Sequence, residues 1–499
     1  MRPLLLALSW LLLLPARLAA AENPNATNTL PRPNILLILA DDLGARDLAF
    51  QGADFHTTPN LDQLSRQGMV FTQGYAGAGN CTPSRACLWS GQYTPRHGVY
   101  AVDSTERGPR DQMRLRAVPG KSGLAPAVTT LPEALKTAGY ATALFGKWHL
   151  GGPDGAPPEQ QGFDTVFDPR AADPNAPGTD PQDPKSMFSL TQAAGDWMQQ
   201  HTNQRFFAVV SHHAIHSALE ARPETLKTFA AKRPGPQHTN VPYAACLADF
   251  DDSVGQLLGR LKDLGLVTNT LVVFTSDNGA TQQSSQEPLR GNKGCYYEGG
   301  IRVPLFMRWP GVIRADSRSG IPVAHVDLFP TLLDVAGVPI PAELKLDGES
   351  LLPLLRNQRL PQRRALFWHF PGYLDTPVIR GRDPVFRTRP VSVIRKGDWK
   401  LHLFHEEWLL HGGRAGLATN NAVELYNLVS DLGERKNLAG AAAKRDELLK
   451  DLLAWIEETG APLATDPNAK PAPKAKPTPK EEPKPTRKPD GKPPLQRKK

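Results

Sequence analysis

Short apolar runs recur along the chain, and a polar cluster follows each of them. The runs are continuous rather than alternating, which is typical of strands buried on both faces of a largely parallel sheet. Segments with helical spacing of apolar residues lie between them, at 57–68, 130–139 and 249–264. This alternation predicts an α/β fold with a large, doubly wound, mostly parallel sheet flanked by helices. The first run, 35–40, is followed by Asp41 and Asp42, and the second, 141–145, by Lys147 and His149. The third, 206–210, is followed by His212, His213 and His216, and the fourth, 271–274, by Asp277 and Asn278.

The predicted topology places these polar clusters together. Parallel strands have their carboxyl ends on one edge of the sheet, and ligands of α/β proteins bind there. We therefore expect the four clusters to meet in one crevice. After about residue 339 the pattern changes to short strands at 365–370, 391–395 and 399–404, followed by a helix at 446–457. This predicts a small C-terminal antiparallel sheet with one helix.

The two ends of the chain differ from its body. Arg2, an apolar run at 4–14 and small residues at Ala19 and Ala21 are typical of a secretory signal peptide, and the run is shorter than the roughly 20 residues that span a membrane. A retained N-terminal anchor is the alternative. We expect an exported protein, periplasmic or secreted. The predicted parts are a signal peptide at 1–21, a linker at 22–31, a catalytic α/β domain at 32–340, a C-terminal subdomain at 341–465 and a Pro/Lys-rich tail at 466–499.

Composition excludes some functional classes. Hydrophobic residues make up 40% of the 499 and charged residues 22%, which is ordinary for a globular protein. The formal net charge of +8 comes entirely from residues 470–499, which hold eleven basic and three acidic side chains. The neutral body gives no reason to expect nucleic-acid binding. The tail is expected to be extended and solvated, with contact to an anionic surface or polymer as the alternative.

The segment that begins at Cys81 carries the strongest chemical signal. Pro83 is suited to the first turn of a helix that ends at Gly91. A thiol at a helix N-terminus, with Arg85 one turn on, is expected to be reactive. A buried structural cysteine is the alternative. If Cys81 is reactive, at most one disulfide remains for the other three cysteines, which are Cys87, Cys246 and Cys295.

Oxygen-bearing and cationic side chains complete the predicted site. Hard cations such as Ca²⁺ and Mg²⁺ prefer carboxylate and amide oxygens, and adjacent carboxylates at a strand end need a cation. A helix N-cap and a tight turn are the alternatives for these pairs. Cationic side chains stabilise charge that develops on an ester oxygen. The predicted metal ligands are Asp41, Asp42, Asp277 and Asn278, and the predicted cations and proton donors are Arg85, Lys147, His149, His216 and Lys293.

The sequence Cys81-Thr82-Pro83-Ser84-Arg85 resembles the maturation signature of type I sulfatases, which are arylsulfatase-like enzymes with the alkaline-phosphatase superfold. Further blocks of that family follow in the same order, at 91–97, 146–151, 277–279, 291–304 and 424–434. The resemblance implies that a maturation enzyme converts Cys81 to formylglycine. It also implies that position 81 joins the four oxygen ligands at a metal, with Ca²⁺ favoured and Mg²⁺ possible.

The resemblance also implies roles for the other site residues. A hydrate of the formylglycine attacks sulfur, His216 and Lys293 assist departure of the alcohol, and His149 deprotonates the second hydroxyl. Arg85 and Lys147 hold the hydrate and its oxyanion. The implied substrate is a sulfated carbohydrate or an aryl sulfate. The sugar itself stays open, because its pocket depends on loops such as 151–185 and 372–389, and because the sequence departs from the family at 217–219 and at Cys295.

Two other functions remain open at this point. A phosphodiesterase or phosphonate hydrolase of the same superfold would share the metal-binding carboxylates. A non-catalytic binder of sulfated glycans would follow if Cys81 stays unmodified.

Overall fold

An eight-stranded sheet forms the centre of the larger part of the protein. The structure is a computed structural model, and it describes residues 32–173, 178, 180–358 and 365–468. All neighbouring strands of this sheet are parallel except β8, which runs antiparallel to both of its neighbours. The predicted mostly parallel sheet is thus confirmed. Its order is β5 (Thr165–Phe167), β4 (Ala141–Gly146), β6 (Phe206–Ser211), β1 (Asn34–Ala40), β7 (Thr270–Ser276), β8 (Leu305–Arg308), β2 (Met69–Phe71) and β9 (Ser317–Ser319).

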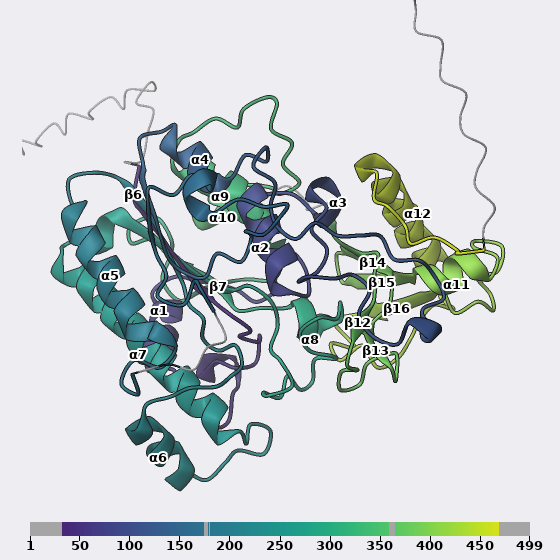
Figure 1. Ribbon diagram of the computed structural model, residues 1–499, viewed down its shortest axis with the longest axis horizontal. Coiled ribbons are helices and arrows are strands. Elements are labelled where there is room, and N and C mark those ends of the chain that lie inside the picture. The colour runs from purple at the N-terminus through teal and green to yellow at the C-terminus, as the bar shows by residue number, and fades with distance from the viewer. Residues whose placement is uncertain (1–31, 174–177, 179, 359–364, 469–499) are drawn as a thin grey trace, which may run out of the picture.

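Helices cover both faces of the sheet (Figure 1). Alternate residues of β1 point into two separate cores: Leu36 and Ile38 into one, Leu37 and Leu39 into the other. This explains why the strand is apolar at every position. The first core contains α1 (Pro59–Arg66), α5 (Met187–Gln200) and α7 (Val241–Asp263), and the second contains α2 (Cys81–Ser90), α4 (Leu131–Lys136), α9 (Leu328–Val335) and α10 (Leu352–Leu355).

Helix α7 begins earlier than the apolar spacing predicted. The expected helix covered 249–264, whereas α7 starts at Val241. The side chain of Asn240 accepts a hydrogen bond from the backbone nitrogen of Tyr243, and Pro242 occupies the first turn. A capping side chain followed by proline is a strong helix start, and it outweighs the weak apolar pattern of the first two turns.

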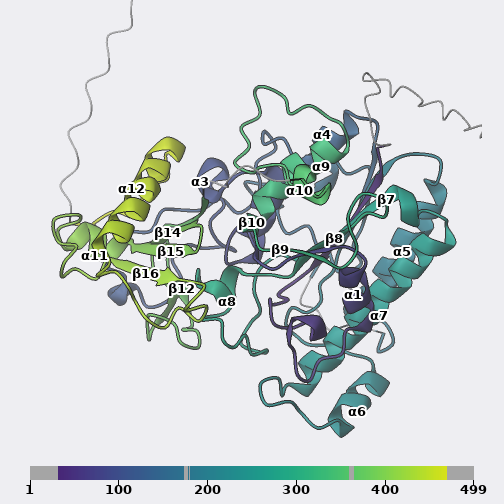
Figure 2. The ribbon, with the colours of Figure 1, turned by 180° about the vertical axis from the view of Figure 1, so that it is seen from behind.

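The C-terminal part is a four-stranded antiparallel sheet against α12 (Ala442–Thr459). Three of its strands were predicted, and the fourth, β16, was missed because it is a short edge strand that alternates polar and apolar residues. Both ribbon views place α8 (Glu298–Ile301) between the two sheets (Figure 2). The strand order is β11 (Leu366–Phe370), β14 (Val391–Lys396), β15 (Trp399–Phe404) and β16 (Val423–Asn427).

Smaller elements complete the described structure. A hairpin of β12 (Leu374–Asp375) and β13 (Phe386–Thr388) lies next to the C-terminal sheet, and β3 (Gly74–Tyr75) pairs with β10 (Val323–Ala324). The remaining α-helices in the described ranges are α3 (Thr94–His97), α6 (Pro223–Ala231) and α11 (His405–Leu410). None of the helices in these ranges is long and apolar enough to cross a bilayer. The predicted signal peptide, the linker and residues 469–499 of the predicted tail lie outside the described residues.

A buried lysine joins the two parts of the protein. Lys400 on β15 is fully buried and forms ion pairs of 3.0 Å with both Glu298 of α8 and Glu434. The Lys400→Met variant would leave Glu434 buried without its lysine partner and Glu298 paired with Arg302 alone. We expect it to lower the free energy of unfolding by about 3–5 kcal/mol in denaturant titrations.

The matched control is Lys396→Met, on the strand that pairs with β15. Lys396 also contacts two carboxylates, Glu447 and Asp451, but its side chain is 38% exposed. Because solvent screens this pair, its loss is expected to cost less than about 1 kcal/mol. Equal effects of the two variants would contradict the assignment of Lys400 as a buried link between the sheets.

Candidate metal centre and active site

The four oxygen-bearing residues lie together at the carboxyl ends of β1 and β7. These strands are parallel neighbours with Ala40 opposite Ser276, so the residues that follow them emerge side by side. The backbone nitrogen of Asp42 donates to Asp277 Oδ1 at 3.2 Å, and Asn278 Nδ2 donates to Asp42 Oδ1 at 2.7 Å. All four side chains, including that of Asp41, are buried. Strand register therefore brings together two pairs that are more than 230 positions apart in the sequence.

Cys81 lies at the first position of α2 and faces this cluster. Its Sγ is 3.6 Å from Asp41 Oδ1 and 3.9 Å from Asp42 Oδ1. One ligand atom from each of Cys81, Asp41, Asp42 and Asp277 fits within 4.8 Å of the others. Helix α2 begins at Cys81 with Pro83 in its first turn, as predicted, and ends at Ser90 before the predicted stop at Gly91, whose φ of 66° suits a helix C-cap.

The surroundings of the Cys81 thiol oppose the reactivity expected from its place at a helix terminus. Burial raises the pKa of this thiol above its ordinary value, and the carboxylates of Asp277 and Asp41 raise it further, against the opposing charges of Lys293 and Lys147. The start of a ten-residue helix supplies too little positive potential to offset complete burial beside carboxylates. Without a bound metal ion, the Cys81 thiol is therefore protonated at neutral pH.

Three cations are paired with the three carboxylates of the cluster. Arg85 donates from Nε to Asp277 Oδ2 at 2.9 Å, and its Nη2 lies 2.8 Å from the same oxygen. Lys147 Nζ donates to Asp41, and Lys293 Nζ lies 2.7 Å from Asp42 Oδ1. The cations thus hold the carboxylates in place.

Two observations show a donor set that suits a cation. Asn278 Oδ1 is buried and accepts no hydrogen bond from any described residue. Burial and the nearby charge of Asp41 raise the pKa of Asp277 to about 6 despite its pairing with Arg85. A hard cation bound here would coordinate the unpartnered oxygen of Asn278 and stabilise the charge of the Asp277 carboxylate. The residues present therefore fit a Ca²⁺ or Mg²⁺ ion.

Arg85 is anchored more deeply than the sequence suggested. Besides Asp277, its Nη1 donates to the carbonyl oxygen of Lys147 at 2.9 Å and to Ser211 Oγ at 2.7 Å. The Arg85 side chain therefore links α2 to the carboxyl ends of β4, β6 and β7 and is held in one position. Ser211, the last residue of β6, was not singled out from the sequence, because a serine after an apolar run carries no specific signal.

Two of the predicted histidines line the opening of the cluster. His216 Nδ1 donates to the carbonyl oxygen of Ser217 at 2.5 Å, and its Nε2 lies 3.8 Å from Asp42 Oδ2. The His216 side chain is 30% exposed, so it meets solvent and the cluster. His149 Nδ1 lies 3.4 Å from Thr82 Oγ1. Burial, and then the charge of Lys147, lower the pKa of His149 to about 2, so that its ring is neutral.

The other two histidines of this region make structural contacts. His213 Nε2 lies 2.9 Å from Asp168 Oδ1. His212 is fully buried against the ring of Phe250, and neither of its nitrogens has a hydrogen-bond partner in the described part of the chain. Burial lowers the pKa of both histidines. All four cysteines are free and buried, so the one bridge allowed by the sequence is not formed.

A second group of potential metal ligands, Asp47, His56 and His238, was not noticed in the sequence. The Asp47 carboxylate already accepts hydrogen bonds from Gly44 N, Tyr243 Oη, Ser284 Oγ and Gln286 Nε2. Because both of its oxygens accept hydrogen bonds, Asp47 stabilises the loop after β1 and is not available as a metal ligand.

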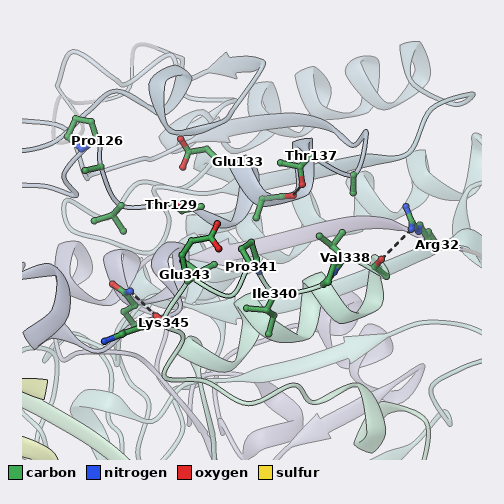
Figure 3. Close-up of a pocket in the computed structure, with 18 residues that line it drawn as sticks. Arg32, Pro126, Thr129, Glu133, Thr137, Val338, Ile340, Pro341, Glu343 and Lys345 are labelled. Carbon is green, nitrogen blue, oxygen red and sulfur yellow. Dashed lines mark hydrogen bonds between the residues drawn. The ribbon is translucent and has the colours of Figure 1, made fainter. Parts of the chain in front are cut away.

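A cavity of about 1060 Å³ lies far from this cluster. Figure 3 shows Arg32, Glu133, Val338, Ile340 and Lys345 around it, with Arg32 donating to the carbonyl oxygen of Gly337. Arg32 precedes β1, whereas Asp41 follows it, so the cavity and the cluster lie at opposite ends of the sheet. Ligand binding at the carboxyl ends of parallel strands favours the cluster as the active site.

Comparison with known proteins identifies the class to which this geometry belongs. A family model described as Sulfatase matches residues 33–338, and one described as N-sulphoglucosamine sulphohydrolase, C-terminal, matches residues 291–460. The chain therefore belongs to the sulfatase family and is a sulfuric ester hydrolase. The resemblance noted in the sequence is confirmed.

Individual relatives cover most of the chain. It is 32% identical to a sulfatase of Formosa agariphila, over 90% of this chain and 93% of that protein. It is 34% identical to human arylsulfatase A, over 82% of this chain and 84% of that protein.

Solved structures share the fold. Ps i-CgsB, in complex with k-i-k-neocarrahexaose, superposes with a TM-score of 0.66 at 25% identity, over 86% of this chain and 92% of the other. The phosphonate monoester hydrolase of Agrobacterium radiobacter does so with a TM-score of 0.62 at 23% identity, over 86% and 96%. The fold alone thus does not separate sulfate from phosphonate esters.

Proposed function

We propose that this protein is exported and hydrolyses sulfate esters of carbohydrates through a formylglycine at position 81 beside a bound Ca²⁺ or Mg²⁺ ion. One observation carries the proposal: at the start of α2 the Cys81 side chain faces Asp41 and Asp42, and one ligand atom of each of these three residues and of Asp277 lies within 4.8 Å of the others. With Asn278, these are the five residues that the sequence predicted as the metal site.

The charges of the centre suit an anionic ester. Three carboxylates and three cations balance within the protein. A divalent ion held by Asp41, Asp42, Asp277 and Asn278 would leave a net positive centre and would act as a Lewis acid toward the sulfate oxygens. The formylglycine group would supply a hydrated aldehyde with two hydroxyls, one to attack sulfur and one to allow release of sulfate.

The chain's own residues position the ester and move protons. His216 donates its Nδ1 proton to a backbone carbonyl, so its Nε2 is the nitrogen that faces the cluster and exchanges a proton with the leaving oxygen. Lys293 Nζ lies within 2.8 Å of both Asp42 oxygens and stabilises charge on that leaving oxygen. The neutral ring of His149, next to Thr82, would orient the second hydroxyl by a hydrogen bond, because its lowered pKa disfavours keeping a proton.

The proposed substrate is a sulfated carbohydrate. Support comes from Ps i-CgsB, which shares the fold and was solved with a neocarrahexaose. Formylglycine formation by a maturation enzyme, and export to a periplasmic or extracellular location, are part of the same proposal. The test is mass spectrometry of the peptide that contains Cys81, from protein made in a host with the maturation enzyme. An aldehyde, lighter than the thiol and reactive toward hydrazides, is expected. An intact thiol would contradict the proposal and favour glycan binding or phosphoester hydrolysis.

Replacement of His216 should separate substrates by their leaving groups. The His216→Ala variant is expected to lower kcat/KM for alkyl sulfates by about 10²- to 10⁴-fold, because general-acid assistance contributes that much. Acidic phenols need little assistance, so aryl sulfates should lose much less. A plot of log kcat/KM against leaving-group pKa measures this as a steeper slope in the variant.

The matched control is His213→Gln, which changes a structural histidine three residues away. Its slope should equal that of the wild type, even if all rates fall. A His216→Ala slope equal to that of the wild type would remove His216 from the role of proton donor.

A further inference from the structure

Arg387 lies beside the proposed centre on the hairpin of the C-terminal part. Its Nη1 donates to the carbonyl oxygen of Lys293 at 3.1 Å, and its Nε donates to the carbonyl oxygen of Thr376 at 3.3 Å. Lys293 contacts Asp42 through its Nζ. The Arg387 guanidinium is therefore about one lysine side chain away from the metal centre. It belongs to the 372–389 segment, which the sequence suggested as part of the pocket for the leaving group.

Arg387 has no carboxylate within ion-pair distance among the described residues. Asp375, on the partner strand of the hairpin, bonds instead to Arg107, at 3.0 and 2.8 Å. Burial lowers the pKa of Arg387, and the charge of Arg107 lowers it further. Three neighbouring arginines in the chain do have acidic partners: Arg380 with Glu287, Arg382 with Glu407 and Arg389 with Glu406.

The Nη2 side of the Arg387 guanidinium is accessible to a ligand. Nη2 of Arg387 donates no hydrogen bond to a described residue, yet it is not among the buried unpaired nitrogens. A guanidinium offers five N–H donors in a planar fork, of which the two backbone carbonyls use two. The remaining donors are available to a ligand that arrives from solvent.

Gly294 makes room for this arginine. A Cβ on Gly294 would lie 2.2 Å from Arg387 Cδ, and the φ of Gly294 is +92°, a conformation that favours glycine. The loop after Lys293 is thus built so that the stem of Arg387 can lie against its backbone. This close approach fixes the guanidinium next to the residue that the proposed function places at the leaving oxygen.

We infer that Arg387 binds a second anionic group of the substrate, an oxyanion carried by the leaving alcohol. A carboxylate of a uronic acid and a further sulfate ester share this chemistry, since both present paired oxygens that match the guanidinium fork. The inference rests on the proposed function and narrows its substrate class to polyanionic carbohydrates. Arg387 is a specificity-determining residue in this view, and the reacting atoms lie at the metal centre.

The test compares matched esters on the matured enzyme. The substrates are para-carboxyphenyl sulfate, its neutral analogue para-carbamoylphenyl sulfate, and para-phenylene disulfate. The Arg387→Ala variant is expected to lower kcat/KM by about 10- to 100-fold for the carboxylate or the disulfate, as loss of a charged hydrogen bond would. The carbamoyl ester should change by less than about 3-fold, so the ratio of the two rates measures the effect. Whichever of the two anionic esters shows the larger drop in kcat/KM carries the group, carboxylate or sulfate, that Arg387 prefers.

A structural role for Arg387 would give a different result. If Arg387 only holds the Lys293 loop, all three esters lose activity equally, and the inference is overturned, as it is if none of them changes. Arg382→Ala serves as the control, because Arg382 is ion-paired and stacks on Phe404, so its rate ratio should stay at the wild-type value.

Failure of the proposed function would look different again. A wild-type enzyme that hydrolyses none of the esters would contradict sulfate-ester hydrolysis itself. In that case calorimetric binding of para-phenylene disulfate and phenyl sulfate to the wild-type and Arg387→Ala proteins decides the inference. A preference for the disulfate that disappears in the variant supports it, and equal preference in both proteins overturns it.

Discussion

The Cys81→Ala variant is expected to lose sulfate-ester hydrolysis almost completely, by about 10⁴- to 10⁶-fold in kcat, as enzymes do when their nucleophile is removed. The remaining carboxylates and cations of the centre would still bind the ester, so KM should change much less than kcat. Initial rates on para-nitrophenyl sulfate measure the loss. Wild-type protein made without a maturation enzyme should be equally inactive, because a thiol has no second hydroxyl with which to release sulfate.

The matched control is Cys87→Ala, six residues further along the same helix. Cys87 is also fully buried, with its Sγ 3.7 Å from the carbonyl oxygen of Gly77, but it does not face the acidic cluster. It should keep most of its activity and lose only packing stability. Substantial turnover by Cys81→Ala, or by the thiol form of the wild type, would show that position 81 is not the nucleophile.

The Asp277→Ala variant should lose both metal and stability. Arg85 is fully buried; Asp277 Oδ2 accepts a hydrogen bond from its Nε and lies 2.8 Å from its Nη2. Removing this carboxylate leaves the buried guanidinium with Asp41, 3.8 Å away, as its remaining carboxylate, and is expected to cost about 3–5 kcal/mol of folding free energy. It also removes one of the proposed metal ligands. Denaturant titrations with and without a chelator measure the two effects: the chelator should destabilise the wild type and leave the variant unchanged, because only a bound ion stabilises the folded state.

Asp252→Ala is the comparison for this second variant. Asp252 pairs with Arg222 at 2.8 Å, but its side chain is 43% exposed and Arg222 keeps a second partner in Asp249. Its loss should cost less than about 1 kcal/mol, and the chelator should still act. A wild type insensitive to chelation would mean that the cluster is held by its own cations alone.

Much of the fold followed from hydrophobic pattern, because strands buried on both faces leave a continuous apolar run. The edge strand β16 did not, since one of its sides is polar and it is only five residues long. The start of α7 depended on the capping by Asn240, a local hydrogen bond that apolar spacing does not report.

The site was harder to derive than the strands. Its members could be listed from the ends of the runs, but their pairing could not, because Arg85 with Asp277 and Lys293 with Asp42 are set by strand order. The raised pKa of Cys81 did not follow from the sequence, because a helix terminus can be recognised in a sequence whereas complete burial beside carboxylates cannot. The role of Arg387 depends on an ion pair that is missing, and a sequence does not show which of several arginines lacks one.

The burial of Cys81 sets a time limit for the proposed maturation. Its side chain is about 1% exposed in the folded protein, so another enzyme cannot reach the thiol there. Asp277 and Lys293, which help to close the site, are made roughly 200 residues later, about 10 to 40 s of synthesis at ordinary rates. Until these residues are synthesised, the site that buries Cys81 cannot form, and the segment around it stays accessible. Conversion to formylglycine would therefore compete with folding of the chain, and faster folding or slower maturation would yield intact but inactive molecules.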